Sequence, residues 1–469
     1  MLKIFPVFLF LFVGLFILFC PQLLDFSLLP GDLGDSRFVN YIFEHTYLFL
    51  TNDSFHNSFF NPPFFYPNLN VLSYSDIVLG LSLIYYPFRF FGINPETSLQ
   101  ITVIIASILN YLSFFLVSKK IFKFSNLTSG LISFLFAFSL SRHLSVWHIQ
   151  LSSQFLSVFS FYFFVKGVKN KNKLDFLISG AFLSLQFWTS YYLTWFFIFG
   201  VFLVCAIFLL NKNTYKIILD FIKINISGIL IFSGSFLILS SNLIYHYFLV
   251  PKHSFEYTWR WAIKPLSFFV SNSFLNSFFT PETSGLNIEN TIGTGIFTTI
   301  LFVLALIHNK KFKIQTNLFI IFLIFLFSSS PLSYPVYAFF IGGAAIRAMG
   351  RVIFILLPVF CVVLGQFLDN KKVSTILLIS ILIVAEQIPS SYDYLYKKGE
   401  TEERISKYSI PDDCSAFYIK GKNYLEVNSN IDAMFLSNKL KKPTMNGYSG
   451  YIPYPDYAKL PKNCIIENK

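Results

Sequence analysis

Charged residues are scarce in this chain. Asp, Glu, Lys and Arg make up 13% of its 469 residues, whereas hydrophobic residues make up 54%. A soluble protein of this length carries roughly a quarter charged residues, so the scarcity excludes an ordinary soluble enzyme. Apolar runs of roughly 20 residues, the length that crosses a bilayer as a helix, recur along most of the chain. The sequence therefore predicts a polytopic membrane protein.

The short motifs of several enzyme classes are also missing. No metal-ligand spacing such as C-x-x-C or H-E-x-x-H occurs, and no Gly-rich loop of the kind that cradles phosphates. Direct binding of a nucleotide is therefore not expected, and whether a divalent metal takes part stays open. Of the five cysteines, only Cys414 and Cys464 follow the last apolar run. An oxidising compartment would permit a disulfide between them, and the sequence leaves that pairing open.

The net charge of +12 is placed in a regular way. Lys-rich clusters fall between apolar runs, at residues 119–123, 166–173, 211–216, 310–313 and 370–372. Short loops rich in Lys and Arg stay on the cytoplasmic side of a membrane. The charge therefore indicates topology, and it predicts no nucleic-acid partner.

We expect an all-α polytopic membrane domain over residues 1–390, followed by a small α/β extracytoplasmic domain over residues 391–469. About 11 transmembrane helices fit the apolar runs. With the N-terminus in the cytoplasm, this count places every Lys-rich cluster inside and leaves outer loops at 25–96, 250–291 and 332–350. The expected spans are 4–24, 97–118, 124–141, 151–165, 175–190, 192–210, 217–249, 292–308, 315–331, 351–368 and 373–390.

Ionisable residues gather just after the first span. Asp32 and Asp35 are close enough for a turn to aim both carboxylates at one point, and such a carboxylate can act as a general base. The alternative is that Asp35 only caps a helix and Asp32 only belongs to a turn. Arg37 and His45, further along the same segment, favour a site. We also expect two amphipathic helices on the membrane surface, residues 36–50 and 76–91.

Other polar groups are expected on the same side of the membrane. Arg142, His148 and Gln150 lie between two expected spans, where they can hydrogen-bond hydroxyl groups or belong to a polar interface belt. Arg347 and Arg351 are four residues apart on an expected helix face, which suits a phosphate or the lipid headgroups.

A loop with both cations and tryptophans adds one weaker candidate. Residues 252–261 mix Lys and Arg with Trp, and Arg260 lies between two of the tryptophans. Cations can bind phosphate, and aromatic faces stack on sugar rings. The same residue types are, however, common at any membrane edge.

Several segments together resemble the GT-C superfamily of polytopic glycosyltransferases, which use polyprenyl-phosphate-linked sugars. More closely, they look like an uncharacterised bacterial membrane family that is placed with GT-C by fold. The likeness covers nearly the whole chain and rests on "GDLGDSRFVNYIFEH" (31–45), "FFYPNLNVLSYSD" (64–76), "HIQLSSQF" (148–155), "IRAMGR" (346–351) and "PTMNGYSGYIP" (443–453).

The resemblance implies roles for these residues. The GT-C acidic motif falls on Asp32 and Asp35, with Asp35 as general base; two residues separate the acids, where the usual pattern is D-x-D or adjacent acids. Arg347 and Arg351 are implied near the lipid phosphate, with His148 and Gln150 lining the cavity. The quoted segments add three further candidates for substrate binding: Tyr66, Asp76 and Tyr448.

The expected function is therefore inverting transfer of a sugar from a polyprenyl-phosphate-linked donor at the outer face of a bacterial cytoplasmic membrane. Its partners are this donor, membrane lipids and an acceptor (glycan, lipid or protein) that the sequence does not identify. One alternative is a transporter or flippase of lipid-linked saccharides, which needs ionisable groups deep in the membrane, with Glu386 as the main candidate. Another is a non-catalytic membrane assembly protein.

Overall fold

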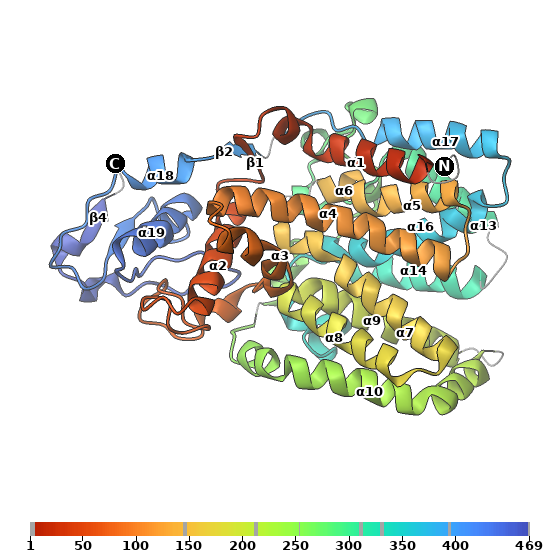
Figure 1. Cartoon of the computed structure of the whole chain (residues 1–469), viewed down its shortest axis with the longest axis horizontal. Coiled ribbons are helices and arrows are strands. Elements are labelled where there is room, and N and C mark those ends of the chain that lie inside the picture. The colour runs from red at the N-terminus through yellow and green to blue at the C-terminus, as the bar shows by residue number, and fades with distance from the viewer. Residues whose placement is uncertain are drawn as a thin grey trace.

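The computed structural model describes residues 5–143, 148–210, 214–252, 254–308, 313–328, 333–392 and 395–467. Helices dominate it. A bundle of long helices forms one end of the molecule, and the C-terminal segment forms the other (Figure 1). The long helices are α1 (Phe5–Leu24), α4 (Pro95–Lys120), α5 (Asn126–Phe138), α7 (Phe155–Asn170), α8 (Lys173–Thr189), α9 (Tyr191–Leu210), α10 (Tyr215–Phe248), α13 (Ile296–His308), α14 (Lys313–Phe327), α16 (Ile353–Leu368) and α17 (Val373–Glu386).

Shorter elements connect these helices and build the C-terminal segment. The helical ones are α2 (Asp35–Leu50), η1 (Val71–Tyr74), α3 (Leu79–Phe90), α6 (Leu140–His143), η2 (Ile149–Ser153), α11 (Phe255–Trp259), η3 (Pro265–Phe268), η4 (Phe274–Asn276), α12 (Pro281–Ser284), η5 (Ile288–Asn290), α15 (Ser333–Phe339), η6 (Gly343–Ala345), η7 (Met349–Val352), α18 (Glu400–Ile405), α19 (Val427–Leu440), η8 (Tyr457–Lys459) and η9 (Lys462–Cys464). The strands are β1 (Leu28–Pro30), β2 (Leu395–Lys397), β3 (Tyr418–Lys420) and β4 (Ile465–Glu467).

The bundle is that of a multi-pass membrane protein. Each span expected from the sequence overlaps one of its helices. Within the described ranges, six helical segments are long and apolar enough to cross a membrane: Phe5–Leu24, Pro95–Lys120, Ile149–Asn170, Tyr191–Leu210, Tyr215–Phe248 and Met349–Leu368. The other helices of the bundle are shorter, so the number of spans stays a prediction.

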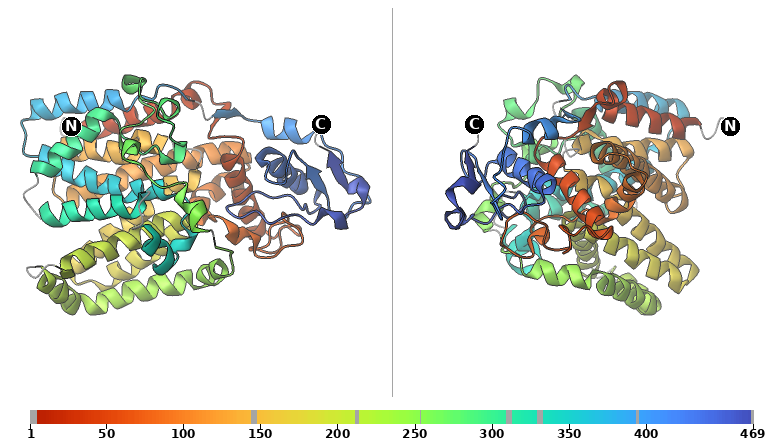
Figure 2. Two further views of the ribbon diagram at one scale, coloured as in Figure 1. Left: turned by 180° about the vertical axis from the view of Figure 1, so that it is seen from behind. Right: turned by 60° about the vertical axis from the view of Figure 1, so that its left-hand side comes forward.

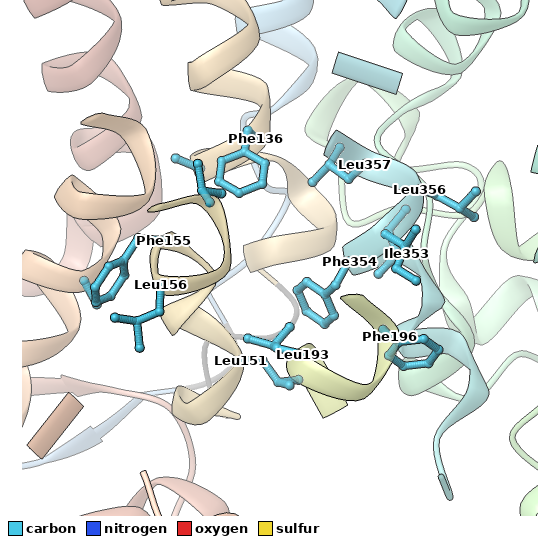
Figure 3. Packing of buried hydrophobic residues seen from close by; sticks show 14 of the residues in the cluster. Phe136, Leu151, Phe155, Leu156, Leu193, Phe196, Ile353, Phe354, Leu356 and Leu357 are labelled. Carbon is cyan, nitrogen blue, oxygen red and sulfur yellow. The ribbon is translucent and has the colours of Figure 1, made fainter. Parts of the chain in front are cut away.

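Aromatic and aliphatic side chains fill the centre of the bundle. Figure 3 shows this core, in which Phe136 of α5, Phe155 of α7, Phe196 of α9 and Phe354 of α16 are all buried. Phe114 of α4 stacks on Phe136 with ring centres 4.3 Å apart. Offset and edge-on ring pairs of this kind add to the burial of apolar area, so the many Phe residues serve the packing.

Small residues let neighbouring helices approach closely. A Cβ on Gly180 of α8 would collide with the Phe232 carbonyl oxygen of α10, and a Cβ on Gly228 of α10 would collide with the Phe176 ring of α8. Lipid is as apolar as the helices, so no hydrophobic force drives membrane helices together. They associate through close packing of this kind, which small residues allow. The long helix α10 is held to the bundle in this way, along one side (Figures 1 and 2).

Helix α2 corrects one expectation. Every residue from Ser36 to Thr46 is buried, so α2 is not an amphipathic helix on the membrane surface. It lies between the bundle and the C-terminal segment, where α3 covers one side and α19 the other (Figures 1 and 2). The physical reason is that polar groups on both faces of α2 find protein partners. Glu44, for example, accepts hydrogen bonds from Arg89 at 2.6 Å and Tyr85 at 2.5 Å.

The C-terminal segment, residues 395–467, has a small core of its own. This core contains Ile405, Phe417, Ile419, Ala433 and Leu436. Its elements are helical and extended, and a turn at residues 424–425 leads into α19. Strands β3 and β4 pair in parallel, and the Cys414–Cys464 disulfide lies beside them. Strand β2 pairs antiparallel with β1, so the segment is joined to the first expected outer loop.

Arg37 joins α2 to the C-terminal segment. Its Nη2 donates to Asp432 of α19 at 2.7 Å, its Nε donates to Thr401 at 3.0 Å, and both charged side chains are 1% exposed. Arg404 contacts the other oxygen of Asp432 at 2.8 Å. Asp432 is therefore paired with two arginines, and it keeps Arg404 as a partner when Arg37 is removed.

We therefore expect Arg37→Met to lower the free energy of unfolding by about 1.5–3 kcal/mol, the contribution of a hydrogen bond to a charged group. Lys420→Met is the matched control, since its pair with Glu467 at 3.0 Å lies at the surface, with the two side chains 49% and 71% exposed. Exposed pairs contribute about 0–1 kcal/mol. Thermal unfolding of both purified variants in the same detergent measures the difference. Equal stability of the two variants would show that Arg37 does not hold the segments together.

Candidate functional site

The two acids before α2 have different roles in the structure. The Asp32 carboxylate accepts a hydrogen bond from the Ser36 amide at 3.2 Å, while Ser36 Oγ accepts one from the Asp32 amide at 3.2 Å. The helix begins at Asp35, and Gly34 occupies the N-cap position without a side-chain cap. Asp32 therefore accepts from an amide of the first turn, and the alternative that Asp35 only caps the helix is wrong. The Asp35 carboxylate does not cap α2, so it is available for contacts with other parts of the chain.

Asp35 contacts two side chains that come from distant parts of the chain. The Tyr448 hydroxyl donates to its Oδ1 at 3.0 Å, and His148 Nδ1 lies 3.5 Å from its Oδ2. The Asp35 side chain is 28% exposed, so a substrate can reach it. Burial and the nearby Asp35 carboxylate raise the pKa of Asp32 above its ordinary value.

Glu289 extends this contact to the two arginines. Its Oε1 lies 3.2 Å from His148 Nε2, 3.4 Å from Arg351 Nη2 and 4.0 Å from Arg347 Nη2. Burial raises the pKa of Glu289, but the nearby Arg351 and His148 bring it well below its usual value. Glu289 is therefore a carboxylate that compensates two cations. We call Asp32, Asp35, His148, Glu289, Arg347, Arg351 and Tyr448 the polar cluster.

The sequence predicted that Arg347 and Arg351 share one helix face, and this prediction is wrong. Ala348 is extended, and the short 3-10 helix η7 begins at Met349. Both arginines nevertheless meet in the cluster because Tyr192 holds them. The Arg351 guanidinium lies 4.3 Å from the centre of the Tyr192 ring, and the Tyr192 hydroxyl accepts from the Arg347 amide at 3.1 Å. A cation over a tyrosine ring is favourable, most of all where water is excluded.

Gly350 allows the two segments of the cluster to touch. A Cβ at this position would collide with the backbone carbonyl oxygen of Glu289. Gly350→Ala is therefore expected to push Glu289 away from Arg351 and to lower thermal stability by about 1–3 kcal/mol, as overpacking does. Gly234→Ala is the control, since nothing lies within 4 Å of its added Cβ. Thermal unfolding of the two variants checks this, and an unchanged Gly350→Ala protein would contradict it.

Asp76 lies at the edge of the cluster. Its carboxylate accepts from the Tyr191 amide at 2.7 Å and from Ser190 Oγ at 3.3 Å, at the start of α9. Burial raises the pKa of Asp76 to about 6, although Arg351 and His148 act in the opposite direction. Asp76 thus links the first expected outer loop to the arginine side of the cluster.

Buried oxygens near the cluster have no hydrogen-bond partner in the described part of the chain. They are Gln150 Oε1, Glu289 Oε2 and Ser449 Oγ, next in sequence to Tyr448. Buried polar atoms are almost always hydrogen-bonded in proteins, so each exception calls for a partner. A polar substrate or bound water satisfies such groups. Gln150, expected to line the site, is compatible with that role.

The structure does not bring five of the expected residues to the cluster: Arg37, His45, Tyr66, Arg142 and Arg260. His45 is fully buried and contacts His56 at 2.8 Å and the Phe59 carbonyl at 2.9 Å. Arg142 is buried, and its Nε donates to the Phe136 carbonyl at 2.6 Å. His45 and Arg142 thus make their hydrogen bonds to other groups of the protein. Tyr66 is 48% exposed, and Arg260 is 68% exposed and pairs with Glu256 at 3.6 Å.

The described residues do not fit a metal centre. No group of three or more His, Cys, Asp or Glu side chains is placed to hold a metal ion in the ranges that the structure describes. The two acids of the expected motif diverge instead, because Asp32 bonds to the backbone of α2 and Asp35 faces Tyr448 and His148. We therefore derive no step through a metal.

Comparison with known proteins rests on structure alone. No protein-family model matches the chain, and no curated protein matches it in sequence. The crystal structure of the Archaeoglobus fulgidus oligosaccharyltransferase, in complex with Zn and sulfate, matches 93% of this chain with a TM-score of 0.50 and 12% identity. The cryo-EM structure of arabinofuranosyltransferase AftD from mycobacteria matches 94% of it with a TM-score of 0.55 and 9% identity.

Both of these proteins are GT-C superfamily membrane glycosyltransferases. This chain has a GT-C-type fold. The finding confirms the fold that the resemblance implied. The chain spans 62% of the length of the oligosaccharyltransferase and 31% of the length of AftD. At such low identity the GT-C likeness describes the fold, and the activity is a separate proposal.

Proposed function

We propose that this GT-C-type chain is a glycosyltransferase that moves a sugar from a polyprenyl-phosphate-linked donor to a hydroxyl of an acceptor. The observation that carries the proposal is the polar cluster itself. A carboxylate that can take a proton, Asp35, is linked through His148 and Glu289 to two arginines that can hold a phosphate. Glycosyl transfer from a lipid phosphate needs these two functions next to each other.

Asp35 is the proposed general base. It takes the proton of the acceptor hydroxyl while the acceptor oxygen attacks the anomeric carbon from the side opposite to the phosphate. The bond between the anomeric carbon and the phosphate oxygen breaks, so the configuration inverts and polyprenyl phosphate leaves. His148 and Tyr448 position the carboxylate, since each contacts one of its two oxygens.

Arg347 and Arg351 are the proposed phosphate ligands. Charge builds up on the phosphate as the sugar leaves, and fixed cations stabilise that charge most where water is excluded. Glu289 occupies both arginines at 3.4 and 4.0 Å. In the proposal, the donor phosphate becomes their second anionic partner, and Glu289 keeps the two guanidinium groups in place before the donor binds.

The site is proposed to lie at the outer face of the cytoplasmic membrane. The Lys-rich clusters of the sequence fall in other loops, which the positive-inside rule assigns to the cytoplasm. A lipid-linked donor is available at the outer face, whereas a nucleotide sugar is not. We also propose the division of the chain into a membrane domain over residues 1–390 and an extracytoplasmic domain over residues 391–469.

The transporter alternative rested on Glu386, and its contacts favour a structural role. Glu386 accepts hydrogen bonds from the backbone amides of Phe297 and Thr298, each at 2.7 Å, at the N-terminus of α13. A carboxylate there satisfies amides that have no partner within the helix. The Glu386 carboxylate is thus bonded to the end of a helix, whereas a group that carries ions must be free to bind and release them.

A transfer assay tests the proposal. The full chain is reconstituted in liposomes with a panel of synthetic polyprenyl-phosphate sugars, and release of polyprenyl phosphate is measured with and without crude cell-envelope glycans as acceptor. Release that requires both the protein and the acceptor supports glycosyl transfer. Movement of the intact lipid-linked sugar between leaflets, without cleavage, would favour the transporter instead.

A further inference from the structure

Tyrosines recur at every third position after the residue that contacts Asp35. Tyr448, Tyr451, Tyr454 and Tyr457 follow one another in the segment "YSGYIPYPDY". We call these four residues the tyrosine row. The proposed mechanism uses only the first of them, whose hydroxyl donates to Asp35 at 3.0 Å.

Each ring of the row is braced by a ring from another segment. The ring centres are 4.7–5.5 Å apart, in the pairs Tyr448 with Phe38, Tyr451 with Tyr74, Tyr454 with Tyr424 and Tyr457 with Tyr418. The bracing rings come from α2, η1, the turn before α19, and β3. A side chain held in this way loses little freedom when it binds a ligand, so the row is preorganised.

The backbone of the row is fixed at its inner end as well. A Cβ on Gly447 would collide with the Phe65 ring, and a Cβ on Gly450 would meet the Tyr74 carbonyl oxygen at 2.8 Å. Beside Tyr448, the buried Ser449 Oγ has no partner within the described ranges. The inner end is therefore pressed against the first expected outer loop, and it presents a hydroxyl that a polar ligand can satisfy.

The outer end of the row is open to solvent. Tyr454 is 69% exposed, an unusual exposure for a large ring that is already held in place by Tyr424. The charged neighbours Asp456 and Lys459 pair with each other at 2.7 Å, which leaves the surface with little net charge. Exposed aromatic groups with hydroxyl tips and no net charge suit a ligand with apolar faces and many hydroxyls.

We propose that the tyrosine row binds the acceptor, and that the acceptor is a carbohydrate chain. Sugar rings place their C–H faces on aromatic rings and their hydroxyls on polar atoms such as those of tyrosine. The row reaches the polar cluster at Asp35, the base that receives the acceptor proton, and not at the arginines proposed for the donor. The acceptor role rests on the proposed function, because it takes Asp35 as the base; binding of a carbohydrate chain by the row does not.

The test uses the full chain in lipid nanodiscs on an array of immobilised oligosaccharides and unglycosylated peptides. The wild-type protein is expected to be retained by oligosaccharides, more strongly as the chain lengthens. Tyr454→Ala and Tyr451→Ala are expected to weaken this retention by about tenfold, the loss of one stacked ring. Tyr454→Trp is expected to restore it, because it keeps the aromatic face.

Phe278→Ala is the matched control. Phe278 is 70% exposed and lies beside another ring, Phe279, but it is outside the row. Its substitution is expected to leave retention unchanged. The proposal is overturned if no oligosaccharide is retained, if the peptides are retained in their place, or if Phe278→Ala weakens retention as much as Tyr454→Ala does.

The outcome is separable from that of the proposed function. Asp35→Asn is expected to keep oligosaccharide binding while it loses transfer. If row variants raise the KM for acceptor and leave the KM for donor unchanged, the acceptor role is supported. If the wild-type protein transfers sugar and the row variants behave like it, the inference fails and the proposed function stands. Oligosaccharide binding without any transfer would leave the row as a carbohydrate site and overturn both its acceptor role and the proposed function.

Discussion

Asp35→Asn is expected to reduce sugar transfer by about 100- to 10,000-fold, the range for loss of a positioned general base. The amide keeps the shape of the side chain and one acceptor oxygen for the Tyr448 hydroxyl, so the fold of the site is retained. It cannot take the acceptor proton. The initial rate of polyprenyl phosphate release at saturating donor, measured in liposomes, gives the effect on kcat.

Two controls make this result specific to Asp35. Asp25→Asn removes an acid from the same expected outer loop, but Asp25 is exposed and hydrogen-bonds Ser27, away from the cluster. Its rate is expected to match that of the wild-type protein. Asp32→Asn keeps an acceptor oxygen for the Ser36 amide and is expected to have a smaller effect than Asp35→Asn. An Asp35→Asn protein within threefold of the wild-type rate would remove Asp35 as the base.

Arg351→Ala is expected to weaken donor binding by about ten- to a hundredfold. A hydrogen bond to a charged group contributes about 1.5–3 kcal/mol, and each 1.4 kcal/mol corresponds to tenfold in affinity. Arg347→Ala is expected to have a similar effect, because both guanidinium groups meet Glu289 at the same oxygen. Lys variants are expected to restore affinity only in part, since an ammonium group lacks the two-pronged contact with phosphate.

Binding of a fluorescent polyprenyl-phosphate sugar to the purified chain measures this affinity directly. Arg260→Ala serves as the control, because Arg260 is 68% exposed and pairs with Glu256 outside the cluster. Its affinity is expected to equal that of the wild-type protein. If both cluster variants bind the donor as well as Arg260→Ala does, the arginines are anchors for lipid headgroups and not donor ligands.

The fold could be predicted from the sequence because membrane helices leave a strong local signal. The apolar runs and the Lys clusters depend only on neighbouring residues, and the observed helices overlap all the runs. The burial of α2 could not be predicted in the same way. Its polar residues, such as Arg37 and Glu44, suggested a water-facing side, but each has a partner far away in the chain, Asp432 and Arg89.

The candidate site could be predicted where polar residues cluster along the sequence or fall in the segments that resemble the GT-C superfamily. Asp35, His148, Arg351 and Tyr448 were all named from the sequence, and the structure brings them together in one cluster. Glu289 was missed because it is one of several acids in its loop and belongs to no recognisable spacing. Its role depends on long-range contacts that only the folded chain provides.

Tyr192 was missed for a different reason. It lies at the beginning of an apolar helix, where a tyrosine is common at a membrane edge. In the structure the Arg351 guanidinium packs over the Tyr192 ring, and the Tyr192 hydroxyl accepts a hydrogen bond from the Arg347 amide. A signal in the sequence was the repeated aromatic pair Tyr191–Tyr192 at the turn between two helices, opposite the charged segments of other loops.

A cryo-EM structure of the full chain in nanodiscs with a non-hydrolysable polyprenyl-phosphate sugar tests the central claim most directly. The account predicts density for the phosphate against Arg347 and Arg351, with the anomeric carbon of the sugar turned towards Asp35. Density for the donor at another place, with no phosphate against Arg347 and Arg351, would contradict it.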